Sequence, residues 1–420
     1  MKSASDRCRV LMLTASLGYG GSESDFLRLA NELAKKMDVT LAVMSLDYGS
    51  ADYSSDRIPT GLPIVVIGGQ SMTGFGALLR KCFRWWRMLV RLRALKRTHD
   101  VCISFLSGPN LLNAASGMPD RTVVSERGSK LYHVGIGRLK KILWLRVLDP
   151  WIYRRSAAIV PASMAYASEI RRVGGRSISS RVIPIEGSID ADAMIESLSA
   201  VPDQDIADFC KEHTAAFCGR LDSGKGIDLI VPAFAKVKRV IPSARLLVIG
   251  DGPLKQAIQS RCESLGLKVG DRPGGECDVY LAGYRKQPVR NYRLCKVFLF
   301  PSLHEGLSNA LIEAVASGVP VLAADCPWGS RSILGGSPEP HDPRGIHEPI
   351  ALPFGTLMPL PSTGEGLVAW ERELARSLAG KGFLRSRSEC MASIARFDVR
   401  VTINEWARMI ESLVQKSRAS

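Results

Sequence analysis

Short apolar runs alternate with amphipathic stretches along almost the whole chain. An amphipathic helix is predicted over about residues 23–36, and helical patterns separate most of the later apolar runs. Short runs between such helices predict buried strands of parallel sheets that are covered on both faces. The strand-like runs are residues 9–14, 39–45, 64–67, 101–105, 122–125, 157–160, 215–218, 245–249, 279–281, 297–300 and 319–323.

The alternation is interrupted near residues 185–203 and then starts again. We therefore expect an α/β protein of two Rossmann-like doubly wound domains, since parallel sheets bind ligands beyond the carboxyl ends of their strands and two such sheets facing across a cleft would share one site. The expected parts are an N-terminal domain at 1–190, a linker at 191–205, a C-terminal domain at 206–395, and a final helix within 396–420 that crosses back to the first domain.

Charge divides the chain at the same place. The 420 residues carry a formal net charge of +15. In residues 1–190, 28 Lys and Arg exceed 15 Asp and Glu by 13, whereas the rest of the chain holds 28 basic and 26 acidic side chains. A basic excess confined to one domain indicates an anionic partner for that domain.

The ten cysteines form no C-x2-C pair, so the sequence has no visible zinc or dithiol motif. Several lie in apolar runs, which predicts buried, reduced thiols. No apolar run approaches the roughly 18 residues that a membrane span needs, and the polar start lacks a signal-peptide core, so we expect a cytoplasmic protein. Two D-x-D strings, at 190–192 and 203–205, fall in the expected linker, and no metal or cofactor is expected.

The most informative segment covers residues 301–320. A loop follows a strand-like run, and a helix is predicted to begin near Ser308 or Asn309, both of which are favoured N-cap residues. Amides at residues 306–310 would then be unpaired donors at a helix N-terminus, which suits a phosphate.

Glu305 in this loop and Glu313 in the helix could contact different parts of one ligand, although acidic residues near a helix start are also common for structural reasons. The whole string resembles the E-x7-E signature "S-x-x-E-G-x-x-N-x-x-x-E-A-x-A-x-G-x-P-V" of the family-4 retaining glycosyltransferases. Further segments resemble that family between about residues 10 and 360. The resemblance implies the fold called GT-B, with two Rossmann-like domains.

The resemblance also implies roles for donor-side residues. Arg220 and Lys225 lie in segments similar to the family's "G-R-L…K-G" motif and would bind the donor diphosphate and offset the charge of the leaving group. Glu305 would contact the donor sugar, and Glu313 the ribose. The other implied donor contacts are Gly20, Gly21, Gly219, Gly283, Tyr284, Gly306, Leu307, Ser308 and Asn309.

On the acceptor side, residues 125–127 resemble a motif of the family's N-terminal domain, so Glu126 and Arg127 are candidates there. His133 is the best candidate for the histidine that many members place near the donor sugar, and a surface histidine is the alternative. The hinge, residues 183–190, lacks the asparagine that the family usually carries.

Two basic, Trp-bearing segments lie in the first domain, at residues 78–97 and 138–155. On a helix, four arginines of the first segment share one face, opposite Leu78, Cys82, Trp85, Leu89 and Leu92. Such helices suit an anionic membrane surface, but their apolar faces could equally pack on the domain's own sheet. The candidate membrane contacts are Arg80, Arg84, Trp85, Trp86, Arg87, Arg91 and Trp144.

The resemblance implies a nucleotide-sugar donor, most simply a UDP-sugar, and a glycan or polyprenyl-linked acceptor in cell-surface polysaccharide synthesis. The place expected for such a reaction is the inner face of the cytoplasmic membrane. The sequence carries no basic-aromatic RNA-binding motif, so no nucleic-acid partner is expected. Two other hypotheses stay open, namely a nucleotide-sugar epimerase on the same fold and a non-catalytic binding protein descended from a transferase.

Overall fold

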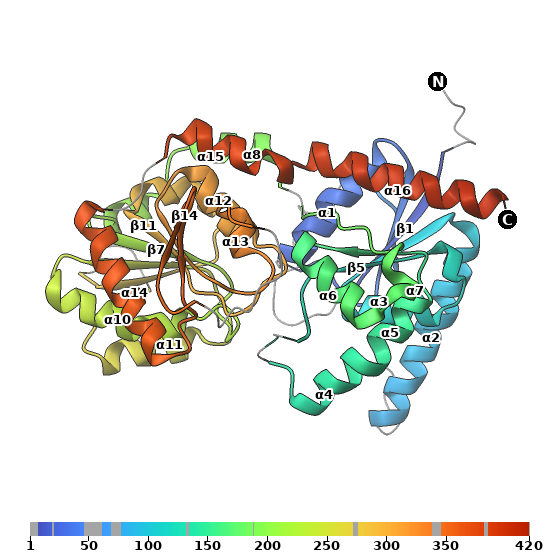
Figure 1. The fold of residues 1–420 in the computed structure, drawn as a ribbon, viewed down its shortest axis with the longest axis horizontal. Helices are drawn as coiled ribbons and strands as arrows, with labels where there is room; N and C mark the ends of the chain where they lie inside the picture. The colour runs from blue at the N-terminus through green and yellow to red at the C-terminus, as the bar shows by residue number, and fades with distance from the viewer. Residues whose placement is uncertain are drawn as a thin grey trace. The chain divides into compact units, whose positions relative to one another are not determined.

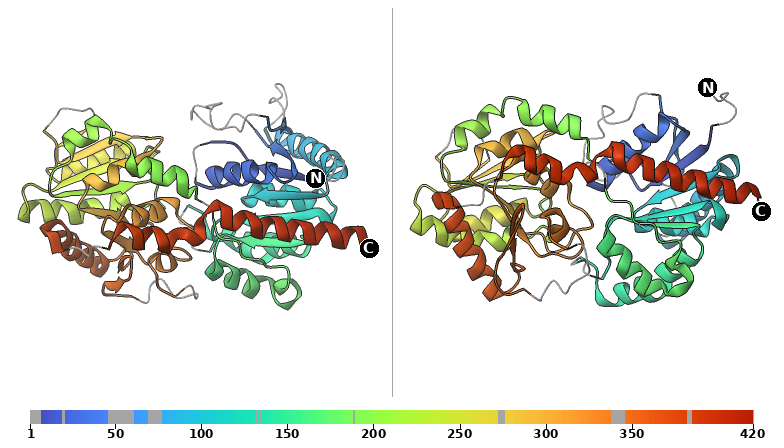
Figure 2. Two further views of the ribbon diagram at one scale, coloured as in Figure 1. Left: turned by 90° about the horizontal axis from the view of Figure 1, so that it is seen from above. Right: turned by 45° about the horizontal axis from the view of Figure 1, so that its top comes forward.

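The computed structural model describes residues 7–18, 21–45, 61–68, 77–131, 133, 135–187, 189–271, 276–337, 346–381 and 385–419. The chain divides into two compact units, each built on one sheet (Figures 1 and 2). The first unit comprises Met1–Leu131, Arg138–Ile189 and Phe397–Ser420. The second comprises Tyr132–Gly137 and Asp190–Arg396.

The sheet of the first unit has six described strands, all parallel, in the order β3-β2-β1-β4-β5-β6. Their runs are apolar because both faces of the sheet are covered. The strands are β1 (Arg9–Thr14), β2 (Asp38–Val43), β3 (Ile64–Val66), β4 (Val101–Phe105), β5 (Thr122–Glu126) and β6 (Ala158–Pro161).

Helices cover both faces of this sheet. On one face, α1 (Gly21–Ala34) and α16 (Val399–Ala419) share a core in which Phe26 and Trp406 both contact Phe105. On the other face, α2 (Ala77–Thr98) and α3 (Ser107–Ala115) pack Met88, Leu92 and Leu112. The remaining helices are η3 (Pro119–Arg121), α4 (Arg138–Leu143), the π-helix η4 (Trp144–Leu148), α5 (Asp149–Arg154), α6 (Met164–Gly174) and α7 (Arg176–Ser179).

The last helix, α16, is part of the first unit although it ends the chain. Its start is held by a parallel bridge between Ile189 and Asp398, in which the Ile189 amide donates to Phe397 O at 2.8 Å and the Val399 amide donates to Ile189 O at 2.8 Å.

The sheet of the second unit has eight described strands in the order β13-β14-β12-β11-β7-β8-β10-β9. All neighbours are parallel except β13 and β14. The strands are β7 (Thr214–Cys218), β8 (Arg245–Ile249), β9 (Val269–Gly270), β10 (Val279–Gly283), β11 (Val297–Phe300), β12 (Val321–Ala324), β13 (Ile350–Leu352) and β14 (Gly355–Met358).

The main core of the second unit lies between this sheet and three helices, which bury Phe234, Ile258 and Trp370. These helices are α10 (Ile227–Val240), α11 (Lys255–Ser264) and α14 (Gly364–Arg376). The others are α8 (Ala191–Ser199), α9 (Gln204–Phe209), η5 (Pro288–Leu294), α12 (Asn309–Ser317), α13 (Ser330–Ile333), η6 (Ser377–Lys381), α15 (Arg387–Ile394) and η7 (Ala395–Phe397).

Strand order reverses once in each sheet. In the first unit, the strands from β1 to β3 extend to one side of the sheet, and the strands from β4 to β6 extend to the other. The reversal therefore lies between β1 and β4. In the second unit it lies between β7 and β11. Ligands of open parallel sheets bind beyond the carboxyl ends of the strands at such reversals. The loops after β7 and β11 are therefore the first place to look for a site.

The predicted α/β class is confirmed, and most predicted runs match strands within one or two residues. The short edge strands β9 and β13 were not predicted, because two or three residues give no periodic signal. The segment predicted as a linker, residues 191–205, contains helix α8 and the first two residues of α9. The reason for α8 is local, since Asp190 Oδ1 accepts from the Ala193 amide at 2.9 Å as an N-cap.

Candidate active site

The loops after β7 and β11 lie side by side. The Leu303 amide donates to Gly224 O at 2.8 Å. Gly226 has φ of +64°, and a Cβ there would lie 2.3 Å from Pro301 O, so only glycine allows this close approach. Residues 219–226 and 301–308 therefore form one surface at the strand-order reversal.

Lys225 and Glu305 meet on this surface as an ion pair. Their side chains are 27% and 12% exposed, so the pair is largely shielded but reachable from solvent. Burial alone would lower the pKa of Lys225, but the charge and hydrogen bond of Glu305 outweigh it and raise that pKa above its ordinary value. The lysine is thus a fixed cation beside a carboxylate, 80 residues away in the sequence.

Arg220 also comes from the loop after β7, where its side chain is 70% exposed and its Nε lies 3.5 Å from Asp222 Oδ2. An exposed ion pair of this kind contributes little to stability. The guanidinium can therefore leave Asp222 and bind an anionic ligand with little loss of stability.

The helix α12 begins at Asn309, as predicted, with Ser308 as its N-cap. The Ser308 hydroxyl makes no capping hydrogen bond to the helix. The loop before it, with Gly306 buried and Leu307 half-buried, packs against the loop after β12, where a Cβ on Gly329 would lie 3.4 Å from Gly306 O. The N-terminus of α12 thus presents backbone donors beside Lys225 and Glu305.

The loop after β12 contains a residue that the sequence analysis missed. Trp328 is 6% exposed and adopts φ of 79°, a left-handed conformation that bulky residues rarely take. Such strain is concentrated near functional sites. No local sequence pattern marks it, because a left-handed tryptophan is not predicted by residue type.

Glu313, on α12, is half-buried and lies near the end of β7. Burial raises the pKa of the Cys218 thiol to about 12, and the charge of Glu313 adds to that rise. Burial also raises the pKa of the Tyr292 hydroxyl, with contributions from Cys218 and Glu313. The carboxylate therefore lies near Cys218, the residue that precedes Gly219 in the sequence.

A third loop joins this surface after β10. The Gly250 amide donates to Gly283 O at 2.8 Å, and a Cβ on Gly250 would lie 1.9 Å from Gly219 O. Tyr284, the next predicted donor residue, is 50% exposed. The loops after β7, β8, β10 and β11, which carry most of the predicted donor residues of the second unit, are thus linked to one another.

The predicted acceptor residues of the first unit are buried and paired. Arg127, with a 5% exposed side chain, donates to Asp25 and lies 5.3 Å above the Phe105 ring. Glu126 is 1% exposed and accepts from Asn110 Nδ2 at 3.1 Å and Lys130 Nζ at 3.2 Å. Neither side chain offers a free group to a ligand in this conformation.

Other predicted residues lie elsewhere. Gly21 is the first residue of α1, and Gly20 lies outside the described residues. His133 is exposed and clusters with the second unit, where its ring lies 4.6 Å from that of His304.

Buried charges continue beyond Glu126 into a cluster that the sequence analysis did not find. Lys130 also pairs with Asp149 at 2.9 Å and lies 5.1 Å above the Trp144 ring. Ser129 donates to Glu169 at 2.8 Å. These residues come from distant segments, so no motif could reveal the cluster.

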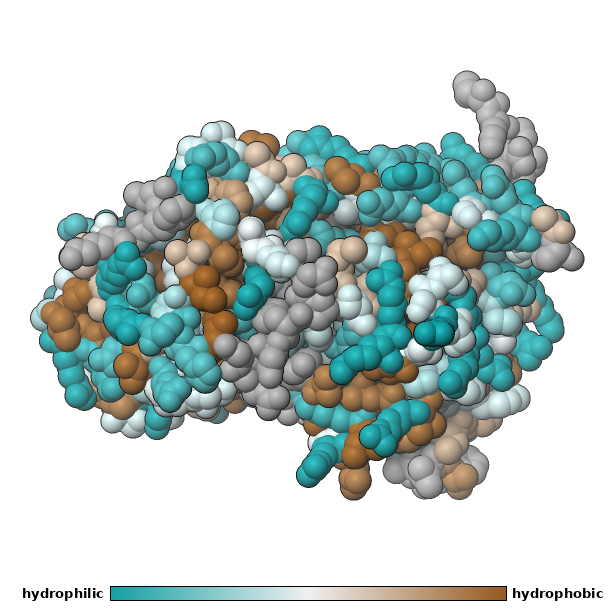
Figure 3. Space-filling view, in the orientation of Figure 1, coloured by the Kyte–Doolittle hydropathy of each residue, from teal (hydrophilic) through white to brown (hydrophobic). Residues whose placement is uncertain are grey.

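The two basic segments form helices with exposed apolar side chains, and brown atoms gather over α4 in Figure 3. Two of the predicted membrane contacts are partly covered by the protein itself. Trp85 packs against the core because α2 turns that face to the sheet, and Trp144 is half-buried beneath Lys130. The exposed apolar residues are Leu79, Phe83, Trp86 and Val90 on α2, and Leu139, Ile142, Leu143 and Val147 on α4 and η4.

The arginines of α2 remain beside this apolar stripe. Arg80, Arg84 and Arg91 are exposed and Arg87 is half-buried. Cys82 on α2 is exposed, whereas the other nine cysteines are buried or half-buried, and all ten are free thiols.

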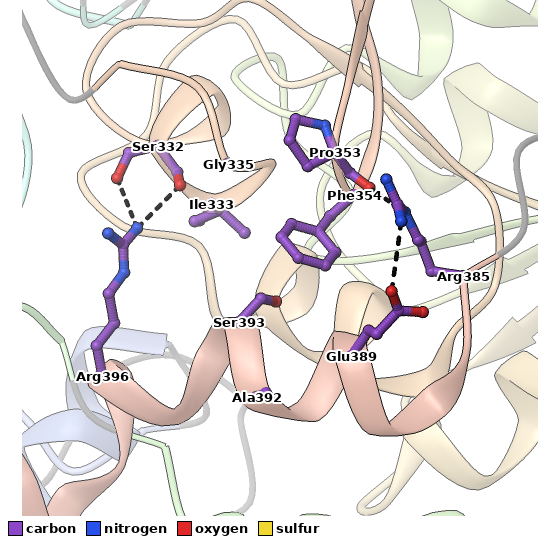
Figure 4. A pocket seen from close by; sticks show the side chains of 10 residues that line it. All are labelled: Ser332, Ile333, Gly335, Pro353, Phe354, Arg385, Glu389, Ala392, Ser393 and Arg396. Atoms are coloured by element: carbon purple, nitrogen blue, oxygen red, sulfur yellow. Dashed lines mark hydrogen bonds and ion pairs between the residues drawn. The ribbon is translucent and has the colours of Figure 1, made fainter.

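A cavity of about 520 Å³ in the second unit contains none of the predicted residues (Figure 4). Its lining comes from α13, the turn between β13 and β14, and α15, with Arg385 and Arg396 at its rim. Within the described ranges, no helix combines the length and apolar character needed to cross a bilayer. No three His, Cys, Asp or Glu in those ranges come together as a metal ion would require.

Sequence comparison places these observations in a family. The family model described as "Glycosyl transferases group 1" matches residues 212–346, which contain Arg220, Lys225, Glu305 and Glu313. An "N-acetylgalactosamine-N,N'-diacetylbacillosaminyl-diphospho-undecaprenol 4-alpha-N-acetylgalactosaminyltransferase" of Campylobacter jejuni is 30% identical over 327 residues, or 76% of this chain and 81% of that protein. An uncharacterized glycosyltransferase of Methanocaldococcus jannaschii is 30% identical over 47% of this chain, which spans only 49% of that relative.

Solved structures show the same fold. The crystal structure of Anabaena HepE in complex with UDP-glucose matches with a TM-score of 0.68 at 16% identity, over 96% of this chain and 99% of that one. Sucrose-phosphate synthase from Thermosynechococcus elongatus matches with a TM-score of 0.65 at 17% identity, over 99% and 100%. The fold is therefore the predicted GT-B fold, and the identity with the Campylobacter enzyme over most of both chains shows that this chain belongs to the group 1 glycosyltransferase family.

Proposed function

We propose that this glycosyltransferase moves a sugar from a UDP-sugar to a glycan or lipid-linked acceptor in cell-surface polysaccharide synthesis, with retention of anomeric configuration. The observation that carries the proposal is the Lys225–Glu305 ion pair beside the N-terminus of α12. This arrangement places a cation, a carboxylate and helix-end amides on one surface, which suits a diphosphate joined to a sugar.

Each donor residue has a role in the proposed reaction. Lys225, Arg220 and the amides at the start of α12 would bind the diphosphate and offset the charge that develops as it leaves. Glu305 would hold the donor sugar near its reacting carbon. Glu313 would bind the ribose, and residues 283 and 284 would meet the base.

The proposed reaction needs no metal. Three of the four D-x-D carboxylates are engaged by the protein, since Asp190 caps α8 and Asp203 and Asp205 pair with arginines. The fixed positive charge of Lys225 and Arg220 would replace the metal that other diphosphate enzymes use. Retention is proposed by front-face attack, in which the leaving diphosphate accepts the proton of the acceptor.

The acceptor is proposed to be lipid-linked, because the Campylobacter relative is named for a diphospho-undecaprenol substrate. The first unit would then rest on an anionic membrane surface through α2 and α4. Leu79, Phe83, Trp86 and Val90 form an exposed apolar stripe next to arginines, as interfacial helices do.

Glu126 and Arg127 would act on the acceptor side as positioning residues. Their burial and pairing hold the loop at the carboxyl end of β5, where a ligand of this sheet would bind.

The donor proposal is tested by thermal unfolding with UDP, GDP and ADP at equal concentrations. A ligand that binds only the folded protein raises its Tm. UDP is expected to raise the Tm more than GDP or ADP does, and Lys225→Ala is expected to abolish the shift. A larger shift with GDP or ADP would contradict the assignment of the base.

A further inference from the structure

Two carboxylates at the start of α9 point away from their own helix. Asp203 is the N-cap residue of α9, yet its side chain makes no capping bond there. It accepts instead from Asn291 Nδ2 at 3.0 Å and forms an ion pair with Arg290. An N-cap aspartate normally accepts hydrogen bonds from the first amides of its helix, whereas Asp203 binds side chains of another segment.

Asp205 lies two residues further along the chain and is joined both to β10 and to the loop after it. It accepts from the Tyr280 hydroxyl at 2.6 Å and pairs with Arg285. The side chains of Asp205 and Arg285 are 18% and 27% exposed. Arg285 Nε has no hydrogen-bond partner among the described residues and lies 4.0 Å from Asp203 Oδ2. The guanidinium is therefore anchored to α9 mainly through Asp205.

The segment that ends at Arg285 joins the sheet through an irregular pairing. The pairing of β10 with β8 shifts register between Leu281 and Gly283, and Gly283 has φ of +69°. Such an irregularity bends a strand and re-aims the residues that follow. The exposed ring of Tyr284 follows directly, so a side-chain anchor just beyond it would fix how residues 283–285 are presented.

The helix α9 has attachments that do not depend on Asp205. The Phe209 ring lies 5.3 Å from the Tyr280 ring, and the Arg245 guanidinium lies 5.3 Å above Phe209. Arg245 also donates to Phe209 O at 2.6 Å. Removing the charge of Asp205 should therefore leave α9 in place.

We infer that Asp205 is a positioning residue for recognition of the nucleotide base. Through Arg285 it holds residues 283–285 in the conformation that presents Tyr284 and the adjacent backbone to the base. The inference rests on the proposed function, because it takes the end of β10 as the base-binding part of the donor site. It assigns no contact between Asp205 and the ligand.

The test compares Asp205→Asn with Asp208→Asn. The first change keeps the size of the side chain and removes the charge that holds Arg285. The second makes the same chemical change at an exposed position of the same helix, where the carboxylate accepts from Gln204 Nε2. For each protein, donor KM, kcat and the inhibition constants of UDP and of inorganic pyrophosphate are measured.

Asp205→Asn is expected to raise donor KM and the UDP inhibition constant about five- to twentyfold, which is less than the full effect of losing a hydrogen bond to a charged group because Asp205 acts on the base only through Arg285. The pyrophosphate constant and kcat should stay within about twofold, because pyrophosphate does not reach the base-binding segment. Asp208→Asn should match the wild type in all four quantities.

Two results would overturn the inference. An unchanged UDP constant in Asp205→Asn would show that the ion pair does not serve base recognition. Equal weakening of UDP and pyrophosphate would show a general structural effect instead. If the wild type binds GDP or ADP in place of UDP, the UDP assignment of the proposed function is refuted. The inference would still be supported if Asp205→Asn then weakened binding of that nucleotide but not of pyrophosphate.

Discussion

At the scale of single residues, exposure separates groups that can act on a ligand from groups that hold the fold. Arg220 is 70% exposed and paired only at the surface, whereas Arg127 is 5% exposed and lies between Asp25 and an aromatic ring. Both arginines were predicted as site residues. These exposures fit the proposed ligand contact of Arg220 and the proposed positioning role of Arg127.

Arg220→Ala is therefore expected to lower kcat/KM about 10- to 100-fold while leaving the free energy of unfolding within about 0.5 kcal/mol of the wild type. The reason is that a diphosphate would lose a charged donor, but the folded protein would lose only an exposed ion pair. Steady-state kinetics and denaturant unfolding measure the two quantities. Arg261→Ala, an exposed arginine of α11, is the matched control, and equal losses of activity in both variants would contradict the assignment.

The same scale shows what the sequence could predict. Lys225 and Glu305 are 80 residues apart, and only the family resemblance brought them together before the structure was known. The pairing of Arg127 with Asp25 and of Glu126 with Asn110 could not be predicted, because these partners lie on other elements and meet β5 only through packing.

At the scale of elements, the buried acidic cluster around the loop after β5 should make stability depend on pH. Glu169 on α6 is 5% exposed, and burial raises its pKa from 4.5 to about 7, against the opposing effects of Ser129 and Arg172. The folded state thus holds this proton to a higher pH than the unfolded chain does. Its contribution to stability is complete below about pH 4.5 and is lost as the pH rises to about 7.

Glu169→Gln should remove the loss of stability that accompanies the rise in pH, because an amide does not ionise. The amide oxygen can still accept the hydrogen bond from Ser129. We expect the free energy of unfolding at pH 8 to exceed that of the wild type by about 1–3 kcal/mol, with no such gain at pH 4.5. Denaturant unfolding at a series of pH values measures the difference. Glu405→Gln, at an exposed position of α16, should show no such gain in the free energy of unfolding at pH 8. An equal gain in both variants would contradict the assignment of the pH dependence to the buried cluster.

The exposed stripe on α2 belongs to the same scale. The pattern along the sequence correctly predicted a basic amphipathic helix, but it could not tell which apolar residues the sheet would cover. Trp85 and Trp86 are neighbours in the sequence, yet one packs on the core and the other is 58% exposed. Which of the two tryptophans is covered depends on tertiary packing and cannot be predicted from periodicity.

Phe83→Ser combined with Trp86→Ser is expected to weaken binding to vesicles that contain phosphatidylglycerol about tenfold or more, since each change removes apolar area from the lipid contact. Co-sedimentation at low and high salt measures it. Val201→Ser with Val240→Ser removes exposed apolar side chains from the second unit and should have no effect. Equal binding of the wild type to neutral vesicles would contradict an anionic surface.

At the scale of the whole molecule, alternating strand and helix patterns were enough to predict two parallel α/β sheets, because buried strands need apolar runs. More residues of the donor side than of the acceptor side could be predicted from the sequence. Its residues lie in short loops at the ends of adjacent strands, where strand order fixes which loops meet. The acceptor side depends on long-range pairing and on exposed surfaces, which no local motif specifies.

The central claim is that the surface around Lys225 and Glu305 transfers sugar from UDP-sugar. The most direct test incubates the protein with radiolabelled UDP-sugars and a polyprenyl-diphosphate-linked sugar, and then separates lipid-linked product from nucleotide-sugar. We predict label in the lipid fraction with the wild type, and a loss of about 100-fold or more with Lys225→Ala. Isomerised nucleotide-sugar formed without acceptor, or equal transfer by Lys225→Ala, would contradict the account.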